Sequence, residues 1–142
     1  MLYRPAFLLG YAGLLPAFFC LLAAAFGPPE WNELALRTGA LYSGLILSFL
    51  GGTWWGIATK AQAKQAMPLY AIAVIPTLAA LGLMMVLSPW RLVLLGVLIA
   101  LTLVVDRLLV QLRLAPDHWM KLRVPLSIGL SAATIGLGLL AL

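Results

Sequence analysis

The sequence predicts an all-α integral membrane protein, a bundle of five transmembrane helices that forms one domain over residues 1–142. Hydrophobic residues make up 64% of the chain and charged residues only 9%, against roughly 25% charged residues in soluble domains. A soluble domain of this length leaves much of its surface in water and has no room to bury so much apolar area. The apolar runs are continuous, whereas strands of a membrane barrel alternate polar and apolar residues.

Five segments are predicted to span the bilayer, because a helix needs about 20 apolar residues to cross it. Four uncharged stretches are long enough alone, and the remaining one, residues 92–105, needs its charged neighbours to reach full length. We expect the first segment to remain as a span, kinked at Pro16, rather than to be removed as a signal peptide. Pro68 and Pro125 suit helix starts. The predicted spans are residues 5–26, 33–59, 68–87, 90–110 and 124–142.

Small residues recur every four positions along the second predicted span. Helices in lipid associate through close packing, which small side chains permit, so this stripe predicts a packed helix face. The contact can lie within the bundle, or it can receive a membrane-protein partner or a second copy of the chain. The stripe consists of Ala40, Gly44, Ser48, Gly52 and Gly56.

Asp106 is the carboxylate that the sequence places inside a predicted span. A charge in the membrane costs at least a few kcal/mol unless it is paired or reaches the surface. Arg123, at the start of the fifth span, should return to the same depth, so we predict a structural ion pair between these two residues. Lys121 is a second candidate partner. A proton or ligand site at Asp106, or exposure at the membrane surface, are the alternatives.

Two tryptophans follow a pair of glycines near the end of the second span. Trp54 and Trp55 can anchor the helix at the membrane interface. Alternatively, together with Gly51 and Gly52, they can form the wall of a ligand pocket, because glycines beside aromatic rings leave room for a flat apolar molecule.

The sequence lacks the motifs of an enzyme, so we expect no catalytic residues. It contains no zinc-binding HExxH helix, no GxSxG nucleophile turn and no phosphate-binding loop. One cysteine and one histidine are too few for a metal cage, and we expect neither a metal nor another cofactor. The net charge of +5 would suggest nucleic acid in a soluble protein, but membrane proteins keep excess Lys and Arg on the cytoplasmic side.

The distribution of basic residues predicts a cytoplasmic N-terminus and an outside C-terminus. With this orientation seven of the nine basic residues lie at the cytoplasmic ends of the spans, where such residues are favoured. Only Arg37 and Arg91 lie on the other side. The cytoplasmic set is Arg4, Lys60, Lys64, Arg107, Arg113, Lys121 and Arg123.

Three segments of the chain resemble a known membrane family. They are residues 46–56 (ILSFLGGTWWG), residues 9–16 (LGYAGLLP), and the later positions Asp106, Trp119 and Arg123. Together they resemble domain of unknown function 3429, a family that includes the mitochondrial transmembrane protein 69 of animals. The family residue at the position of Trp54 is usually basic, often histidine, so the resemblance implies no metal or proton-transfer role there in this chain.

The resemblance implies a small multi-span protein of bacterial inner membranes or mitochondria, without a settled activity. A weaker similarity connects the chain with the tryptophan-rich sensory (translocator) proteins, through the five spans and the loop at residues 28–31 (PPEW). We therefore expect a multi-pass protein of a bacterial inner membrane, in contact with lipids. The first functional hypothesis is a non-catalytic packing or assembly partner of a membrane complex. The alternative is a binder or carrier of a small apolar or amphipathic ligand.

Overall fold

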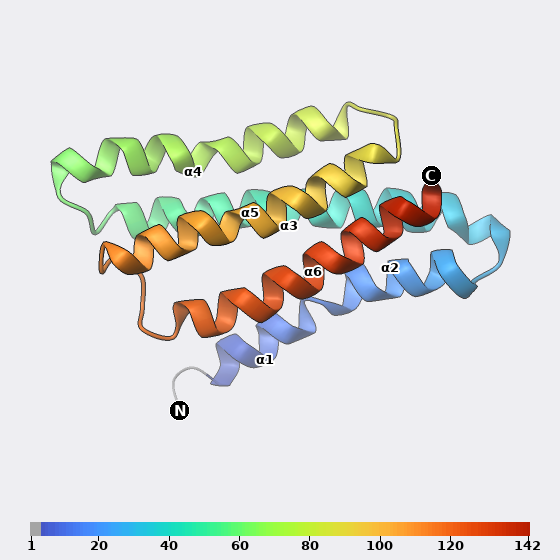
Figure 1. The fold of residues 1–142 in the computed structure, drawn as a ribbon, viewed down its shortest axis with the longest axis horizontal. Helices are drawn as coiled ribbons and strands as arrows, with labels where there is room; N and C mark the ends of the chain where they lie inside the picture. The colour runs from blue at the N-terminus through green and yellow to red at the C-terminus, as the bar shows by residue number, and fades with distance from the viewer. Residues whose placement is uncertain (1–3) are drawn as a thin grey trace.

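The computed structural model describes residues 4–142, and every regular element in this range is helical. The helices run side by side along the long axis, and the start of the first helix and the end of the last helix lie toward opposite ends of the molecule (Figure 1). Five segments are long and apolar enough to cross a membrane, which confirms the predicted all-α class. The elements are α1 (Arg4–Ala12), α2 (Leu15–Phe26), the 3-10 turn η1 (Pro29–Trp31), α3 (Asn32–Ala58), α4 (Ala63–Met84), α5 (Trp90–Gln111) and α6 (Trp119–Ala141).

The first apolar segment is divided into two helices rather than kinked. Helix α1 ends one turn before Pro16, and Pro16 lies in the first turn of α2. The proline ring lacks an N–H group and clashes with the carbonyl four residues earlier, that of Ala12. The hydroxyl of Tyr42 on α3 donates a hydrogen bond to the carbonyl of Gly13 at the break. A neighbouring helix thus satisfies a backbone group that the break leaves open.

Helices α4 and α6 begin one turn or more before the predicted positions. The starts near residues 68 and 124 are wrong, because Pro68 and Pro125 lie inside the helices. Each proline leaves the carbonyl four residues earlier without its helical partner. These carbonyls belong to the exposed residues Lys64 and Lys121, at helix ends where water and lipid headgroups can bond them. The predicted bounds of the second and fourth spans agree with α3 and α5 to within one residue.

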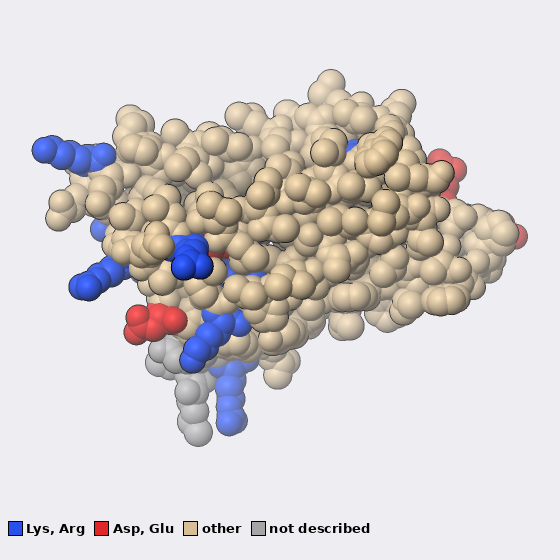
Figure 2. Space-filling model, in the orientation of Figure 1, with Lys and Arg blue, Asp and Glu red and all other residues tan. Residues whose placement is uncertain are grey.

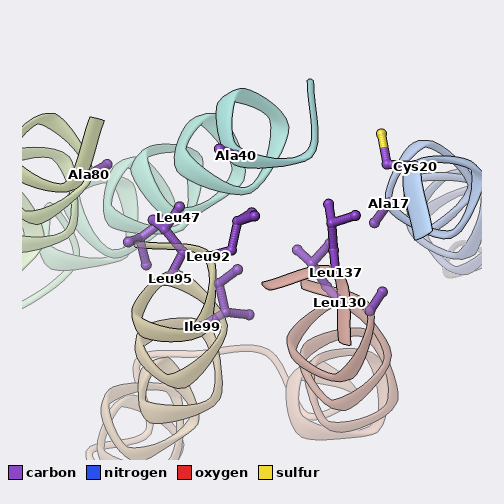
Figure 3. Close-up of a cluster of buried hydrophobic side chains, with 11 residues drawn as sticks. Ala17, Cys20, Ala40, Leu47, Ala80, Leu92, Leu95, Ile99, Leu130 and Leu137 are labelled. Carbon is purple, nitrogen blue, oxygen red and sulfur yellow. The ribbon is translucent and has the colours of Figure 1, made fainter. Parts of the chain in front are cut away.

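Helix α3 is the central element of the bundle. It contacts α2, α4, α5 and α6, while α5 and α6 pack along each other. Apolar side chains from α2 to α6 converge between these helices, with Leu47, Leu95 and Leu137 among the most buried (Figure 3). Helix α1 differs, because none of its residues is buried. The other helices therefore pack around α3, whereas α1 lies on the surface of the bundle.

The predicted small-residue stripe does not form one packed face. Ala40 and Gly44 are buried, and the side chains of Ala80 and Met84 on α4 lie against Gly44. Ser48 shares a 2.8 Å hydrogen bond with Thr77. The two remaining members, at positions 52 and 56, meet open space. Residues spaced by four advance about 400° around a helix, a drift of about 40° per step, so the two ends of the stripe face different sides.

Charged side chains gather at the two ends of the molecule (Figure 2). Basic side chains crowd the end that holds the start of α1 and the α3–α4 and α5–α6 connections, where Asp117 also lies, whereas the acidic side chains before and within the first turn of α3 lie at the opposite end. This excess of basic side chains at one end is the pattern on which the predicted orientation depends. The orientation itself stays a prediction.

Candidate ligand pocket beside the Asp106 cluster

The carboxylate of Asp106 lies in the interior of the bundle, with no part of the residue exposed. Its Oδ1 accepts hydrogen bonds from the indole Nε1 atoms of Trp54, at 2.9 Å, and of Trp119, at 3.0 Å. Its Oδ2 accepts a bond from Nε of Arg123 at 2.9 Å. A buried carboxylate is tolerated in a membrane protein only with such partners. Three helices, α3, α5 and α6, therefore meet at this group.

Arg123 lies in the second turn of α6 and is buried. The predicted ion pair with Asp106 is present, and it is the one salt bridge among residues 4–142. The Nη2 atom donates a second bond, of 3.2 Å, to the hydroxyl of Thr102, which itself donates to the carbonyl of Ile99. The two opposite charges compensate each other within the bundle. We call Trp54, Thr102, Asp106, Trp119 and Arg123 the Asp106 cluster.

The sequence analysis named Trp119 only as part of the family resemblance and did not single out Thr102. The spacing of polar residues along α5 and α6 could have indicated that these residues meet. Thr102 and Asp106 are four residues apart on α5, and Trp119 and Arg123 are four apart on α6. Residues at this spacing share a helix face, so two facing pairs of polar residues indicate a buried polar contact between the helices.

A cavity of about 400 Å³ adjoins the cluster, bounded by α1, α3, α5 and α6. Its walls are mainly apolar, and the polar side chains among them are Thr53, Trp119, Arg123 and Ser127. Leu9 of α1 and Phe49 of α3 lie at its margin with 72% and 66% of their surface exposed, so the cavity opens toward lipid. The lining includes Leu9, Phe49, Thr53, Ile99, Trp119, Arg123, Leu126, Ser127 and Leu130.

Ser127 is the polar residue of this cavity that lacks a partner. It is 1% exposed, and its hydroxyl makes no hydrogen bond to any part of residues 4–142. The other buried serine and threonine hydroxyls are all bonded; for example, Ser131 donates to the carbonyl of Gly96 at 2.7 Å. Ser127 follows Arg123 by one helical turn, so both lie on the same face of α6. The sequence analysis missed Ser127 because a lone serine in an apolar run carries no pattern.

The predicted pocket wall at residues 51–55 does not exist as one surface. Trp54 is buried in the Asp106 cluster, while Trp55 is 49% exposed and packs on Tyr70, with the ring centroids 4.5 Å apart. Gly51 lies against the backbone of Ala73 on α4, and Gly52 faces open space. Successive residues point about 100° apart around a helix, so neighbours in sequence cannot all face one cavity.

The described part of the chain offers no ready metal site. Within residues 4–142, no three His, Cys, Asp or Glu side chains lie close enough together to hold an ion.

Comparison with known proteins gives one match. A family model described as a protein of unknown function (DUF3429) matches residues 2–140. The search of curated proteins and the search of solved structures each found no match. The similarities to the mitochondrial transmembrane protein and to the translocator proteins therefore stay predictions.

Proposed function

The chain belongs to the DUF3429 family of proteins of unknown function, and we propose that it binds a small apolar molecule that enters the cavity from the lipid phase. The observation that supports this function is the cavity between α1, α3, α5 and α6, with mainly apolar walls and a few polar side chains. Its volume of about 400 Å³ lies within the range of small-molecule sites, which combine apolar walls with a few polar groups. The role is binding or carriage without catalysis.

The access route is between α1 and α3. Helix α1 packs against α6 and buries none of its own residues. The exposed margin at Leu9 and Phe49 gives a lipid-soluble molecule a sideways path into the bundle. Such a molecule need not cross the charged ends of the protein.

The test uses an alkyl diazirine, an apolar photoreactive probe, with the full chain in lipid nanodiscs. We expect mass spectrometry to find the label on cavity residues of α3 and α6. Leu126→Trp fills the cavity and should reduce labelling at these residues several-fold. The matched control is Ile128→Trp on the same helix, because Ile128 is 57% exposed and does not line the cavity. Equal labelling of both variants, spread over the lipid-facing surface, would reject the binding function.

The second candidate function is that of a packing or assembly partner in a membrane complex. It is supported by the open half of the stripe on α3, where Gly52 and Gly56 have no neighbour within 4 Å. Small residues permit close approach of another helix. A partner protein that copurifies from native membranes should be lost with Gly56→Leu and retained with Gly82→Leu, since Gly82 is an equally open glycine on α4. Loss with neither variant would remove this candidate.

The membrane placement is also a proposal. The separation of basic and acidic ends favours a cytoplasmic N-terminus and an outside C-terminus in a bacterial inner membrane. Reporter fusions after Leu142 should therefore report the periplasmic side. A cytoplasmic signal would reverse the orientation.

A further inference from the structure

The hydroxyl of Ser127 is a hydrogen-bond donor that the protein leaves unused. A serine inside a helix can bond the carbonyl four residues earlier, as Thr134 does with Leu130 at 2.7 Å. Ser127 makes no such bond and lies buried at the cavity. An unsatisfied buried hydroxyl is unfavourable and calls for an explanation, and a ligand group that accepts its hydrogen bond supplies one.

Arg123 offers a second donor at the same end of the cavity. Its Nε and Nη2 atoms are bonded to Asp106 and Thr102. Its Nη1 atom makes no hydrogen bond to any of residues 4–142, and the side chain lines the cavity. An arginine has five N–H donors and no acceptor. Both side chains line the cavity and carry a donor that is not bonded within residues 4–142, so both can donate to a ligand, and neither requires a donor from it.

The charge balance at this end of the cavity excludes an anionic head group. Asp106 already compensates the charge of Arg123 through the 2.9 Å bond. A bound carboxylate would add a net negative charge to a site that lies among apolar side chains, and uncompensated charge in such surroundings is strongly unfavourable. A neutral acceptor avoids this cost and still satisfies both donors.

We infer that the occupant of the cavity is a neutral carbonyl compound with an apolar body, held by hydrogen bonds from Ser127 and Arg123 to its carbonyl oxygen. Ketones, esters and quinones soluble in the membrane belong to this class. The inference rests on the proposed binding function, and it adds the chemistry of the head group.

The experiment compares three probes of similar size as competitors of diazirine labelling in nanodiscs at pH 8. They are 2-undecanone, which has a neutral carbonyl, undecane, which has no polar group, and decanoate, which is anionic. We expect 2-undecanone to compete about fivefold better than undecane, the factor of one buried hydrogen bond. Decanoate should compete no better than undecane.

Ser127→Ala tests the assignment of the donor. The variant should fold, because it removes a hydroxyl without a partner, and it should abolish most of the advantage of 2-undecanone over undecane. The control is Ser131→Ala, one turn later on α6, which removes a bonded hydroxyl that does not line the cavity. It should keep that advantage. In the infrared spectrum, the carbonyl stretch of bound 2-undecanone should lie at higher frequency in Ser127→Ala than in the wild type.

The outcomes separate this inference from the proposed function. Equal competition by 2-undecanone and undecane in the wild type, with both weakened by Leu126→Trp, would retain the apolar site and overturn the carbonyl assignment. Stronger competition by decanoate would overturn it as well. No competition by any probe, and no effect of Leu126→Trp, would reject the binding function itself.

Discussion

The Asp106 cluster and the cavity beside it share Trp119 and Arg123 of α6, yet their polar groups differ in hydrogen bonding. In the cluster, the carboxylate accepts three hydrogen bonds and Arg123 donates to two side chains. In the cavity, the hydroxyl of Ser127 has none. The cluster holds helices together, because lipid offers its charges no other partners. The cavity combines empty space with a buried hydroxyl that is not bonded within residues 4–142.

The two regions also differ in the helices that surround them. The cluster joins α3, α5 and α6, which have extensive buried faces. The cavity is bounded by α1, which has no buried residue and is separated from α2 by the break at residues 13–14. A wall that buries little of its own surface can move at low cost in free energy. The difference indicates that the Asp106 cluster is rigid, whereas α1, which bounds the cavity, can move.

The largest expected effect comes from breaking the ion pair of the cluster. Asp106→Asn and Arg123→Gln should each lower the free energy of unfolding by about 3–5 kcal/mol, because either change leaves the other charge buried without its partner. The double variant should cost clearly less than the sum of the two. Unfolding in detergent measures all three variants. Strict additivity would show that the two side chains do not interact.

Substitution of the two adjacent glycines of α3 should have smaller effects on stability, and the two effects should differ. A methyl group on Gly51 would collide with the backbone of Ala73 on α4, whereas one on Gly52 meets nothing within 4 Å. Gly51→Ala should cost about 1–3 kcal/mol through overpacking. Gly52→Ala should be neutral or stabilising, since alanine favours the helix by up to about 1 kcal/mol.

This pair of variants also tests the stripe that the sequence predicts. Thermal unfolding in the same detergent gives the order of the two variants. Equal destabilisation by both variants would show that position 52 lies on a packed face. It would contradict the open space found at positions 52 and 56 of α3.

Substitution of the two neighbouring tryptophans should also change stability by different amounts. Trp54→Phe removes the bond from the indole Nε1 to Asp106 and should cost about 1.5–3 kcal/mol, as for hydrogen bonds to charged groups. Trp55→Phe keeps an aromatic ring beside Tyr70 and should change stability by less than about 0.5 kcal/mol. The measurement is again thermal unfolding. A larger loss with Trp55→Phe would contradict the assignment of Trp54 to the cluster.

The smallest and most diagnostic difference concerns the two serines of α6. Ser131→Ala removes a bonded hydroxyl and should cost about 0.6 kcal/mol, the average for side-chain bonds between membrane helices. Ser127→Ala should leave stability unchanged or raise it slightly, because its hydroxyl is buried without a bond to residues 4–142. Stability measured without added ligand gives the sign. A clear loss with Ser127→Ala would show that its hydroxyl is bonded within the protein.

The sequence by itself determined the class of the protein, the number of its spans and the pairing of Asp106 with Arg123. These features depend on distance along the chain, because the thickness of the bilayer sets the span length and a buried charge must find the partner that returns to its depth. For the same reason, the bounds of α3 and α5 were predicted to within one residue. The starts of α4 and α6 did not, because prolines near helix ends are tolerated where headgroups and water reach the freed carbonyls.

Only the tertiary structure decided which side of each helix meets a neighbour. The stripe on α3 drifts around the helix, so its two ends face different sides. The glycine that packs most closely on α4 is Gly51, which lies outside the stripe. The cavity depends on how α1, before the break near Pro16, lies against α6. Such features arise from the rotation and spacing of helices relative to one another, which no single segment of the sequence encodes.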